Sequence, residues 1–215
     1  MAYSFDPSYP QQARQDVMRG IARWNQVLGD CLPLQPRTSS DRDYINVHNG
    51  GGCSSMVGRV GGGQALSLAV NGCVHQGTVI HEFLHAAGLI HTQQRPDRDN
   101  YITMHWENIV SSWRSQFTKE SPSNIGKYTD YDIYSIMHYS TSHPSWSVNN
   151  QPGFTAKNPN VDSRRIGTGD DFTKSDALAI RRMYKCPERK FTTAVNSNNR
   201  NQGNKDRQPI LCSNE

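Results

Sequence analysis

The stretch HEFLHAAGLIH, from His81 to His91, places three histidines and one glutamate among apolar residues and a glycine. Each residue of an α-helix advances by about 100°, so His81 and His85 point to the same side. On a continued helix His91 would lie ~280° from His81 and could not join them. Gly88 can adopt a left-handed conformation, end the helix and return His91 as a third ligand. The stretch therefore predicts a helix that ends near Gly88 and a site where three histidines bind a metal.

Three neutral imidazoles leave the charge of a Zn²⁺ ion to act on water, whose pKa then falls toward ~7. Glu82 lies next to His81, where its carboxylate can reach such a water as general base without being a ligand. Two other interpretations are a buried helix with hydrogen-bonded histidines and a structural zinc site. A structural site usually recruits a fourth protein ligand and does not need Glu82. The coincidence of all five fixed positions of HExxHxxGxxH favours catalytic zinc and metal-assisted hydrolysis.

The length and charge of the chain limit the kinds of protein it can be. With 215 residues, it is long enough for one globular domain, which a cleft could divide into two lobes. The net charge of +4 is mild, and the basic pairs at 164–165 and 181–182 are short, so we expect no nucleic-acid partner. No apolar stretch approaches the roughly 20 residues that span a membrane. The N-terminus lacks the blocks of a signal peptide, which leaves a cytosolic protein or a processed form of a secreted one.

Cysteine usage favours the processed form. None of the cysteines forms a CxxC pair, which argues against a thiolate zinc site. Cys53 and Cys73 bracket a segment of hairpin length, so a local disulfide is plausible. Cys31 and Cys186 lie near opposite ends of the globular region and could tie them together. Spacing alone does not fix this connectivity, free thiols remain the alternative, and Cys212 is left over in a polar tail.

The first half of the chain predicts helices and short strands. Apolar residues three or four apart over residues 11–28 predict an amphipathic helix between Pro10 and Gly29. Three apolar runs separated by glycine-rich turns predict strands: YINV from Tyr44, MVGRV from Met56 and QALSLAV from Gln64. A second helix, beginning near Gln76, carries the histidines.

The second half is less regular. We expect a short helix around residues 108–117 and another over residues 173–184. Thr173 and Asp176 have the spacing of a capping box, and Ala177, Ile180 and Tyr184 would share one face. Residues 187–215 are polar, lack apolar periodicity and predict a flexible extension.

A methionine motif adds a resemblance to a known family. HExxHxxGxxH is the signature of the metzincin metalloproteases, which also carry a methionine-containing turn further along the chain. This chain has SIMHY from Ser135 to Tyr139, and RPDRD from Arg95 to Asp99 continues the zinc motif. With the segment 53–73 and the four cysteines discussed above, the chain resembles the astacin family from about Ala2 to Cys186.

This resemblance implies a fold and a domain organisation. The expected fold class is α+β: a two-lobed metzincin-type domain whose N-terminal lobe has a twisted, mostly parallel sheet with an antiparallel edge strand and two long helices. The C-terminal lobe would be irregular and end in a helix. The catalytic domain would cover residues 1–186, divided into lobes of about 1–91 and 92–186, and residues 187–215 would form the extension.

The resemblance also implies roles for particular residues. Zn²⁺ would be held by His81, His85 and His91, with Tyr139 as an additional ligand that can leave the metal and act as an oxyanion-hole group. The implied disulfides are Cys31–Cys186 and Cys53–Cys73. The run QALSLAV would be an edge strand at the rim of the cleft, where extended substrate pairs through its backbone. For the charges of RPDRD, a structural network behind the zinc helix is favoured over substrate contacts.

Three features depart from the family pattern. Members usually have a glutamate after the third histidine, which receives the N-terminus freed when the propeptide is cut, whereas this chain has Thr92. The chain also begins at the family's first strand, so activation through a buried terminus is not expected for this form. IGTG, from Ile166 to Gly169, stands where many relatives have IGQR, so the resemblance does not imply a preference for acidic residues after the cleaved bond.

The sequence therefore predicts a secreted, monomeric zinc endopeptidase that binds protein or peptide substrates in extended form. Glu82 and Tyr139 would be its catalytic residues. The main alternative is a catalytically silent, secreted zinc- or matrix-binding module of the same fold, which would tolerate loss of Glu82. A different metzincin would not use Tyr139 as a ligand, and a cytosolic binding domain would have free thiols.

Overall fold

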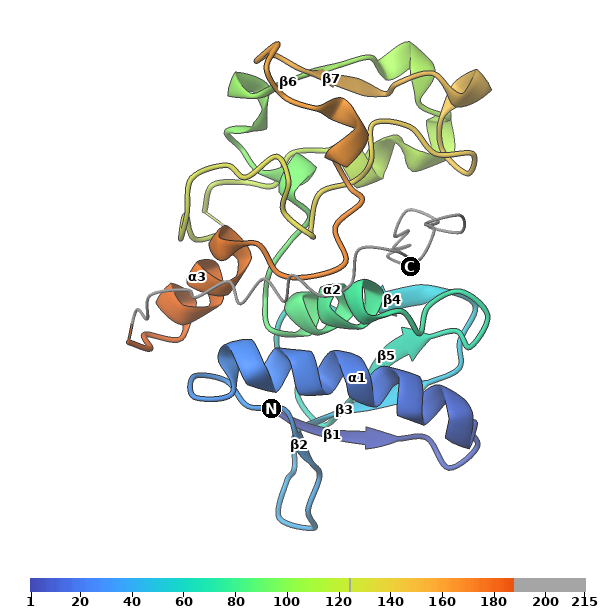
Figure 1. Ribbon diagram of the computed structural model, residues 1–215, viewed down its shortest axis with the longest axis vertical. Coiled ribbons are helices and arrows are strands. Elements are labelled where there is room, and N and C mark those ends of the chain that lie inside the picture. Colours follow the sequence, from blue (N-terminus) through green and yellow to red (C-terminus); the bar gives the residue numbers. More distant parts are fainter. Residues whose placement is uncertain (124, 188–215) are drawn as a thin grey trace, which may run out of the picture.

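The elements before His91 form one group and most of those after it form a second, one above the other in Figure 1. The structure is a computed structural model that describes residues 1–123 and 125–187. The expected extension therefore lies outside the described residues, apart from Pro187. Among the described residues, no helix is both long and apolar enough to cross a membrane.

A five-stranded mixed sheet forms the base of the N-terminal group (Figure 1). Its order is β2-β1-β3-β5-β4, and every neighbouring pair is parallel except β4 and β5. The predicted sheet, mostly parallel with one antiparallel edge strand, is confirmed. The strands are β1 (Ala2–Phe5), β2 (Gln35–Pro36), β3 (Tyr44–His48), β4 (Cys53–Ser55) and β5 (Gly63–Leu68).

Two helices, α1 (Gln11–Leu28) and α2 (Gln76–Ala86), pack against each other beside this sheet. The apolar face predicted for α1 is buried, with its members at most 2% exposed: Val17, Ile21, Trp24 and Leu28. Gly20 lies where the helices meet, and a Cβ atom there would be 2.6 Å from Val79 of α2. The absence of a side chain at Gly20 thus lets the backbone of α1 approach the helix that carries the histidines.

The C-terminal group is built mainly from loops and short 3₁₀ helices around a second, smaller core. Its sheet has two antiparallel strands, β6 (Ile102–Met104) and β7 (Phe154–Ala156). The helix predicted near residues 108–117 is a 3₁₀ helix, η4 (Ser111–Phe117). The other 3₁₀ helices are η1 (Thr92–Gln94), η2 (Arg98–Asn100), η3 (Trp106–Asn108), η5 (Val148–Asn150) and η6 (Ser163–Arg165).

The last helix, α3 (Lys174–Met183), returns to the N-terminal group. Its predicted capping box is present, since Thr173 and Asp176 each accept a hydrogen bond from the other's backbone N–H. Ala177 and Ile180 are buried as expected. Tyr184, which was expected in the same helix, lies just past its end at Met183 and is 41% exposed.

Two predictions about strands were wrong. Residues 56–60 (MVGRV) form no strand, because Gly58 has a φ of +78° and the chain turns there, leaving Met56 and Val60 51% and 55% exposed. The strand in this region, β4, comes just before them. The run QALSLAV is not an edge strand, because β5 lies between β3 and β4. The edge on this side of the sheet is β4.

Both expected disulfides are present. Cys31–Cys186 joins the segment just after α1 to the segment just after α3, and Cys53–Cys73 joins the edge strand to the loop before α2. Arg181 of α3 supports the first by an ion pair with Asp30 at 2.7 Å.

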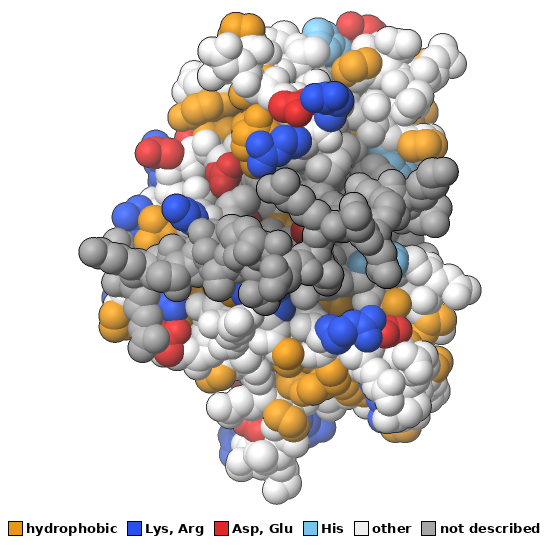
Figure 2. All heavy atoms as spheres, in the orientation of Figure 1, with side chains coloured by type: hydrophobic (Ala, Val, Ile, Leu, Met, Phe, Trp, Pro, Cys, Tyr) orange, Lys and Arg blue, Asp and Glu red, His pale blue; other side chains and the backbone are white. Residues whose placement is uncertain are grey.

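Charged side chains of both signs are spread over the visible part of the face in Figure 2. Lys and Arg side chains occur there in small groups next to Asp and Glu, with apolar side chains between them. This is the distribution of an ordinary solvated surface.

Removal of the two disulfides is expected to destabilise the fold unequally. The Cys31–Cys186 bond closes 155 residues and the Cys53–Cys73 bond 20. From chain entropy alone, replacing each pair by serine should lower the free energy of unfolding by about 5 and about 3 kcal/mol respectively. Urea denaturation of the two double variants measures the difference. An equal loss, or a greater loss for Cys53–Cys73, would contradict this.

Candidate metal centre

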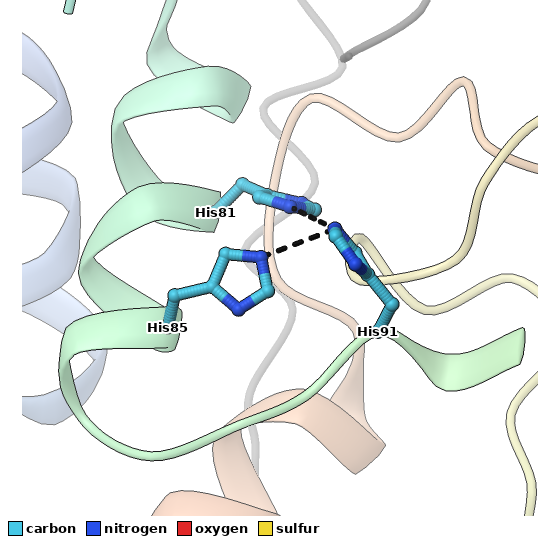
Figure 3. A group of neighbouring side chains, drawn as sticks. All are labelled: His81, His85 and His91. Carbon is cyan, nitrogen blue, oxygen red and sulfur yellow. Dashed lines mark hydrogen bonds between the residues drawn. The ribbon is translucent and has the colours of Figure 1, made fainter. Parts of the chain in front are cut away.

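Three histidine rings meet at one point between the two groups of elements (Figure 3). His81 and His85 lie one turn apart on α2, and His91 reaches them from the segment that follows. The Nε2 atom of His91 is 3.3 Å from Nε2 of His81 and 3.1 Å from Nε2 of His85. Nitrogen ligands at 2.0–2.1 Å from a tetrahedral Zn²⁺ ion are about 3.3 Å apart, so this spacing fits zinc.

The turn at Gly88 returns His91 to the helix, as the sequence predicted. Gly88 has a φ of +112° and donates from its N–H to the carbonyl of His85 at 2.8 Å. The N–H of Leu89 then donates to the carbonyl of Leu84 at 3.0 Å. These bonds satisfy the last carbonyls of α2 while the chain reverses.

The outer nitrogens of two rings determine which nitrogen faces the centre. The Nδ1 atom of His81 is 2.8 Å from the carbonyl oxygen of Ile136, and that of His85 is 2.7 Å from the carbonyl oxygen of Leu89. A carbonyl only accepts, so both Nδ1 atoms carry the hydrogen. Each Nε2 atom therefore presents its lone pair to the centre, as a metal ligand must.

The protonation state of the rings also suits a metal. Burial lowers the pKa of His85 to about 4. It holds the pKa of His81 and His91 well below 6.5, and the neighbouring rings lower both further. All three rings are at most 1% exposed. They are neutral at pH 7, which is the form that binds zinc.

The methionine turn, residues 135–137, lies against the rings from the C-terminal group. Besides the bond from His81 to Ile136, the N–H of Thr92 donates to the carbonyl of Met137 at 2.9 Å. Met137 itself is 1% exposed. The turn thus fixes the first histidine and the residue after the third.

Asp176 holds this turn, a role that its place in a capping box did not reveal. Its carboxylate accepts from Ser135 Oγ at 2.6 Å and from the N–H of Ile136 at 3.1 Å. It is 4% exposed, and burial raises the pKa of its carboxyl group. Thr173 and Asp176 had the spacing of a capping box, but nothing in the local sequence pointed to the bond from Asp176 to the methionine turn.

Tyr139 lies beside the third histidine, and Glu82 lies on the helix that carries the first two. The Tyr139 ring is 4.5 Å from the His91 ring, centre to centre, and its side chain is buried against Phe117. Glu82 follows His81 on α2 and is completely buried. The structure therefore groups Tyr139 with the histidines and leaves the roles of both residues as predictions.

The charges of RPDRD form a structural network, as favoured from the sequence. Arg95 makes a bidentate pair with Asp97, at 2.9 and 2.8 Å, and reaches the carbonyl of Thr129. Arg98 is buried, pairs with Asp99 and donates to the carbonyls of Gln93 and Phe117. These bonds hold together the segment that follows the third histidine.

Thr92 lines a cavity of about 550 Å³ behind the methionine turn. Met137, Asp176 and Met183 are among the other residues around it. Thr92 is 6% exposed, and the backbone bond to Met137 described above is the link between this position and the turn.

Known proteins share both the sequence pattern and the fold. The family model for the astacin peptidases matches residues 1–185. Zinc metalloproteinase nas-13 of Caenorhabditis elegans is 34% identical over 197 residues, which are 91% of this chain and 42% of that protein. Blastula protease 10 of Paracentrotus lividus is 33% identical over 86% of this chain and 31% of its own length. The chain thus spans less than half the length of these relatives.

A solved structure supports the comparison. High choriolytic enzyme 1, a hatching enzyme zinc-protease from Oryzias latipes, has a TM-score of 0.77 with this chain at 32% identity. The match covers 87% of this chain and 90% of that one. Myroilysin, at 18% identity and a TM-score of 0.58, shares the fold.

Replacing Gly88 by alanine should weaken zinc binding. A φ of +112° is unfavourable for any residue with a Cβ atom, so the turn would shift and displace His91. We expect zinc affinity, measured by competition with a chelator, to fall roughly ten- to hundredfold. Gly51→Ala is the control, because a Cβ at Gly51 meets no atom within 4 Å. Equal zinc affinity in the two variants would contradict this account of the turn.

Acid should destabilise the metal-free protein. Burial lowers the pKa of His85 and His138 to about 4, and that of His81 and His91 well below 6.5. Between pH 6.5 and about 4 the unfolded chain therefore binds more protons at these groups, so the free energy of unfolding falls as the pH drops. Burial raises the pKa of Asp176, so at this one carboxyl group the folded protein binds more protons than the unfolded chain. Its contribution therefore opposes that of the four histidines. Urea denaturation at several pH values measures how the free energy of unfolding depends on pH. An unchanged denaturation midpoint from pH 7 to about 4.5 would contradict the predicted loss of stability.

Proposed function

The chain belongs to the astacin family of zinc metalloproteases, and on that premise we propose that it is a zinc-dependent endopeptidase. The observation that carries the proposal is the convergence of three neutral imidazoles, with a buried glutamate on the same helix. We further propose that residues 1–186 form the catalytic domain, with lobes of about 1–91 and 92–186.

His81, His85 and His91 would hold the zinc ion through their Nε2 atoms. When bound, zinc supplies a Lewis acid that lowers the pKa of a water molecule to about 7 and polarises a carbonyl group. The rings of His81 and His85 are held for this purpose by the carbonyls of Ile136 and Leu89, so the ligand positions need little rearrangement.

Glu82 would act as general base. Its carboxylate takes the proton from the attacking water and passes it to the nitrogen of the departing amine, so one group serves both half-reactions. Tyr139, beside His91, would serve as an additional ligand in the resting enzyme. During the reaction its phenol would donate a hydrogen bond to the oxygen of the carbonyl under attack.

Protein or peptide substrates would bind in extended form. The edge strand β4 is antiparallel to β5 and presents its other side to an added strand (Figure 1). Pairing of backbone groups gives affinity with little dependence on side chains, as suits cleavage of unfolded or looped segments. β4 thus takes the role of substrate-pairing edge strand that the resemblance implied for QALSLAV.

Secretion and a monomeric state complete the proposal. Two disulfides, one of which joins residues 155 positions apart, persist in an oxidising compartment such as the extracellular space. The alternative is a catalytically silent module of the same fold, secreted and binding zinc or matrix. It shares the disulfides and the histidines and differs only in needing no general base.

Replacing Glu82 by glutamine separates these two functions. The amide preserves the size of the side chain but cannot accept the proton, so we expect cleavage of casein or gelatin to fall by roughly 10²- to 10⁴-fold. Zinc content, measured by atomic absorption, should stay near that of the unsubstituted protein. A Glu82→Gln protein with full activity would contradict the proposed role, and an unsubstituted protein that binds zinc but never cleaves would favour the silent module.

A further inference from the structure

We propose that Gln93, His138 and Tyr131 are positioning residues that hold the backbone of Tyr139, so that only its side chain moves during the reaction. The inference rests on the function proposed for Tyr139. A phenol that alternates between a metal and a substrate oxygen needs a fixed pivot, because a displacement of about 1 Å at a reacting group can slow a reaction considerably.

Gln93 holds one side of the Tyr139 backbone. Its Oε1 atom accepts from the N–H of Tyr139 at 3.1 Å, and the residue is completely buried. An N–H only donates, so the oxygen of the amide must face Tyr139. Nε2 of Gln93 is then left buried without a hydrogen-bond partner among the described residues. Such an unsatisfied donor is rare, and its presence here indicates that the bond to Tyr139 dictates the orientation of the amide.

His138 holds the other side. Its Nδ1 atom is 2.8 Å from the carbonyl oxygen of Tyr139, and its Nε2 atom is 2.8 Å from the hydroxyl of Tyr131. The carbonyl accepts from Nδ1, so Nδ1 carries the hydrogen. In the tautomer with that single hydrogen, Nε2 accepts from the Tyr131 hydroxyl, and the ring is 3% exposed. Tyr131 therefore selects the tautomer of His138 that can bind Tyr139.

Tyr131 is itself anchored in the C-terminal group. Its ring stacks on that of Tyr101 with centres 4.5 Å apart and planes 7° apart, and it is 9% exposed. The ring of His138 packs against Phe154 at 5.2 Å. These contacts connect the pivot to the second core.

Gly167 packs against the backbone that follows Tyr139. A Cβ atom at Gly167 would lie 2.1 Å from the backbone N of Ser140 and 2.5 Å from the carbonyl carbon of Tyr139. The segment around Gly167 thus packs directly on the peptide that follows Tyr139. The N–H, the carbonyl and the following peptide of Tyr139 are all held, which confines motion to its side-chain torsions.

Tyr131→Phe is the mildest test, because it removes one hydroxyl and leaves the packing. Without that donor, His138 can adopt the tautomer that no longer donates to Tyr139. We expect kcat for a peptide substrate to fall roughly three- to tenfold while KM stays within about twofold, since substrate-binding groups are untouched. Tyr9→Phe is the matched control: the Tyr9 hydroxyl is also buried and donates to a carbonyl, that of Leu68 at 2.7 Å. It should lower the melting temperature without changing kcat.

A spectroscopic readout makes the test independent of turnover. In the copper(II)-substituted protein, a phenolate ligand gives a ligand-to-metal charge-transfer absorption, which should be present in the unsubstituted sequence and absent in Tyr139→Phe. We expect this band to weaken or shift in Tyr131→Phe and to be unchanged in Tyr9→Phe. His138→Asn, which retains a donor near the Nδ1 position, should recover part of the kcat lost in His138→Leu.

Several outcomes would overturn the proposal. They are an unchanged kcat and band in Tyr131→Phe, an equal loss of kcat in Tyr9→Phe, and absence of the band from the copper protein of unsubstituted sequence. If His138→Leu does not fold, Tyr131→Phe decides alone. A protein that shows the band and its dependence on Tyr131 but never cleaves peptides would refute the proposed function and leave the positioning role standing.

Discussion

The metal centre depends on one reversal of the backbone, at Gly88. A helix can bring two histidines to one side but not the third, because its geometry carries His91 away from His81. The φ of +112° at Gly88 ends α2 and lets the chain return, while two backbone hydrogen bonds keep the end of the helix satisfied. The three Nε2 atoms then meet at the spacing that zinc requires.

The two groups of elements meet at the same place, because the methionine turn serves both. Its carbonyls fix His81 and the residue after His91, and its own conformation is held by the buried carboxylate of Asp176. Asp176 also caps α3, whose end is tied to α1 through Cys31–Cys186. A substitution that shifts α3 would therefore displace the methionine turn and, through its hydrogen bonds, the metal ligands. All three histidines would still be present.

The sequence predicted what depends on periodicity and spacing, and it missed what depends on tertiary contacts. Residues 11–28 follow a helical period. In the signature from His81 to His91, the spacing of the histidines and the glycine determines where the helix ends and how the third ring returns. Both features were therefore predicted from the sequence. Residues 56–60 resemble the short apolar run of a strand, but the chain turns at Gly58, which has a positive φ, and the edge strand is β4. The bond from Asp176 to the methionine turn joins residues 40 positions apart, and no local pattern announces it.

X-ray absorption at the zinc edge of the zinc-loaded protein tests the central claim most directly, because it reports the atoms bound to the metal. We expect three imidazole nitrogens at about 2.0–2.1 Å, with the remaining ligands oxygen and no sulfur. The outer-shell scattering typical of imidazole should diminish when His91 is replaced by alanine. A first shell that contains sulfur, or fewer than three imidazoles in the unsubstituted protein, would contradict the proposed centre.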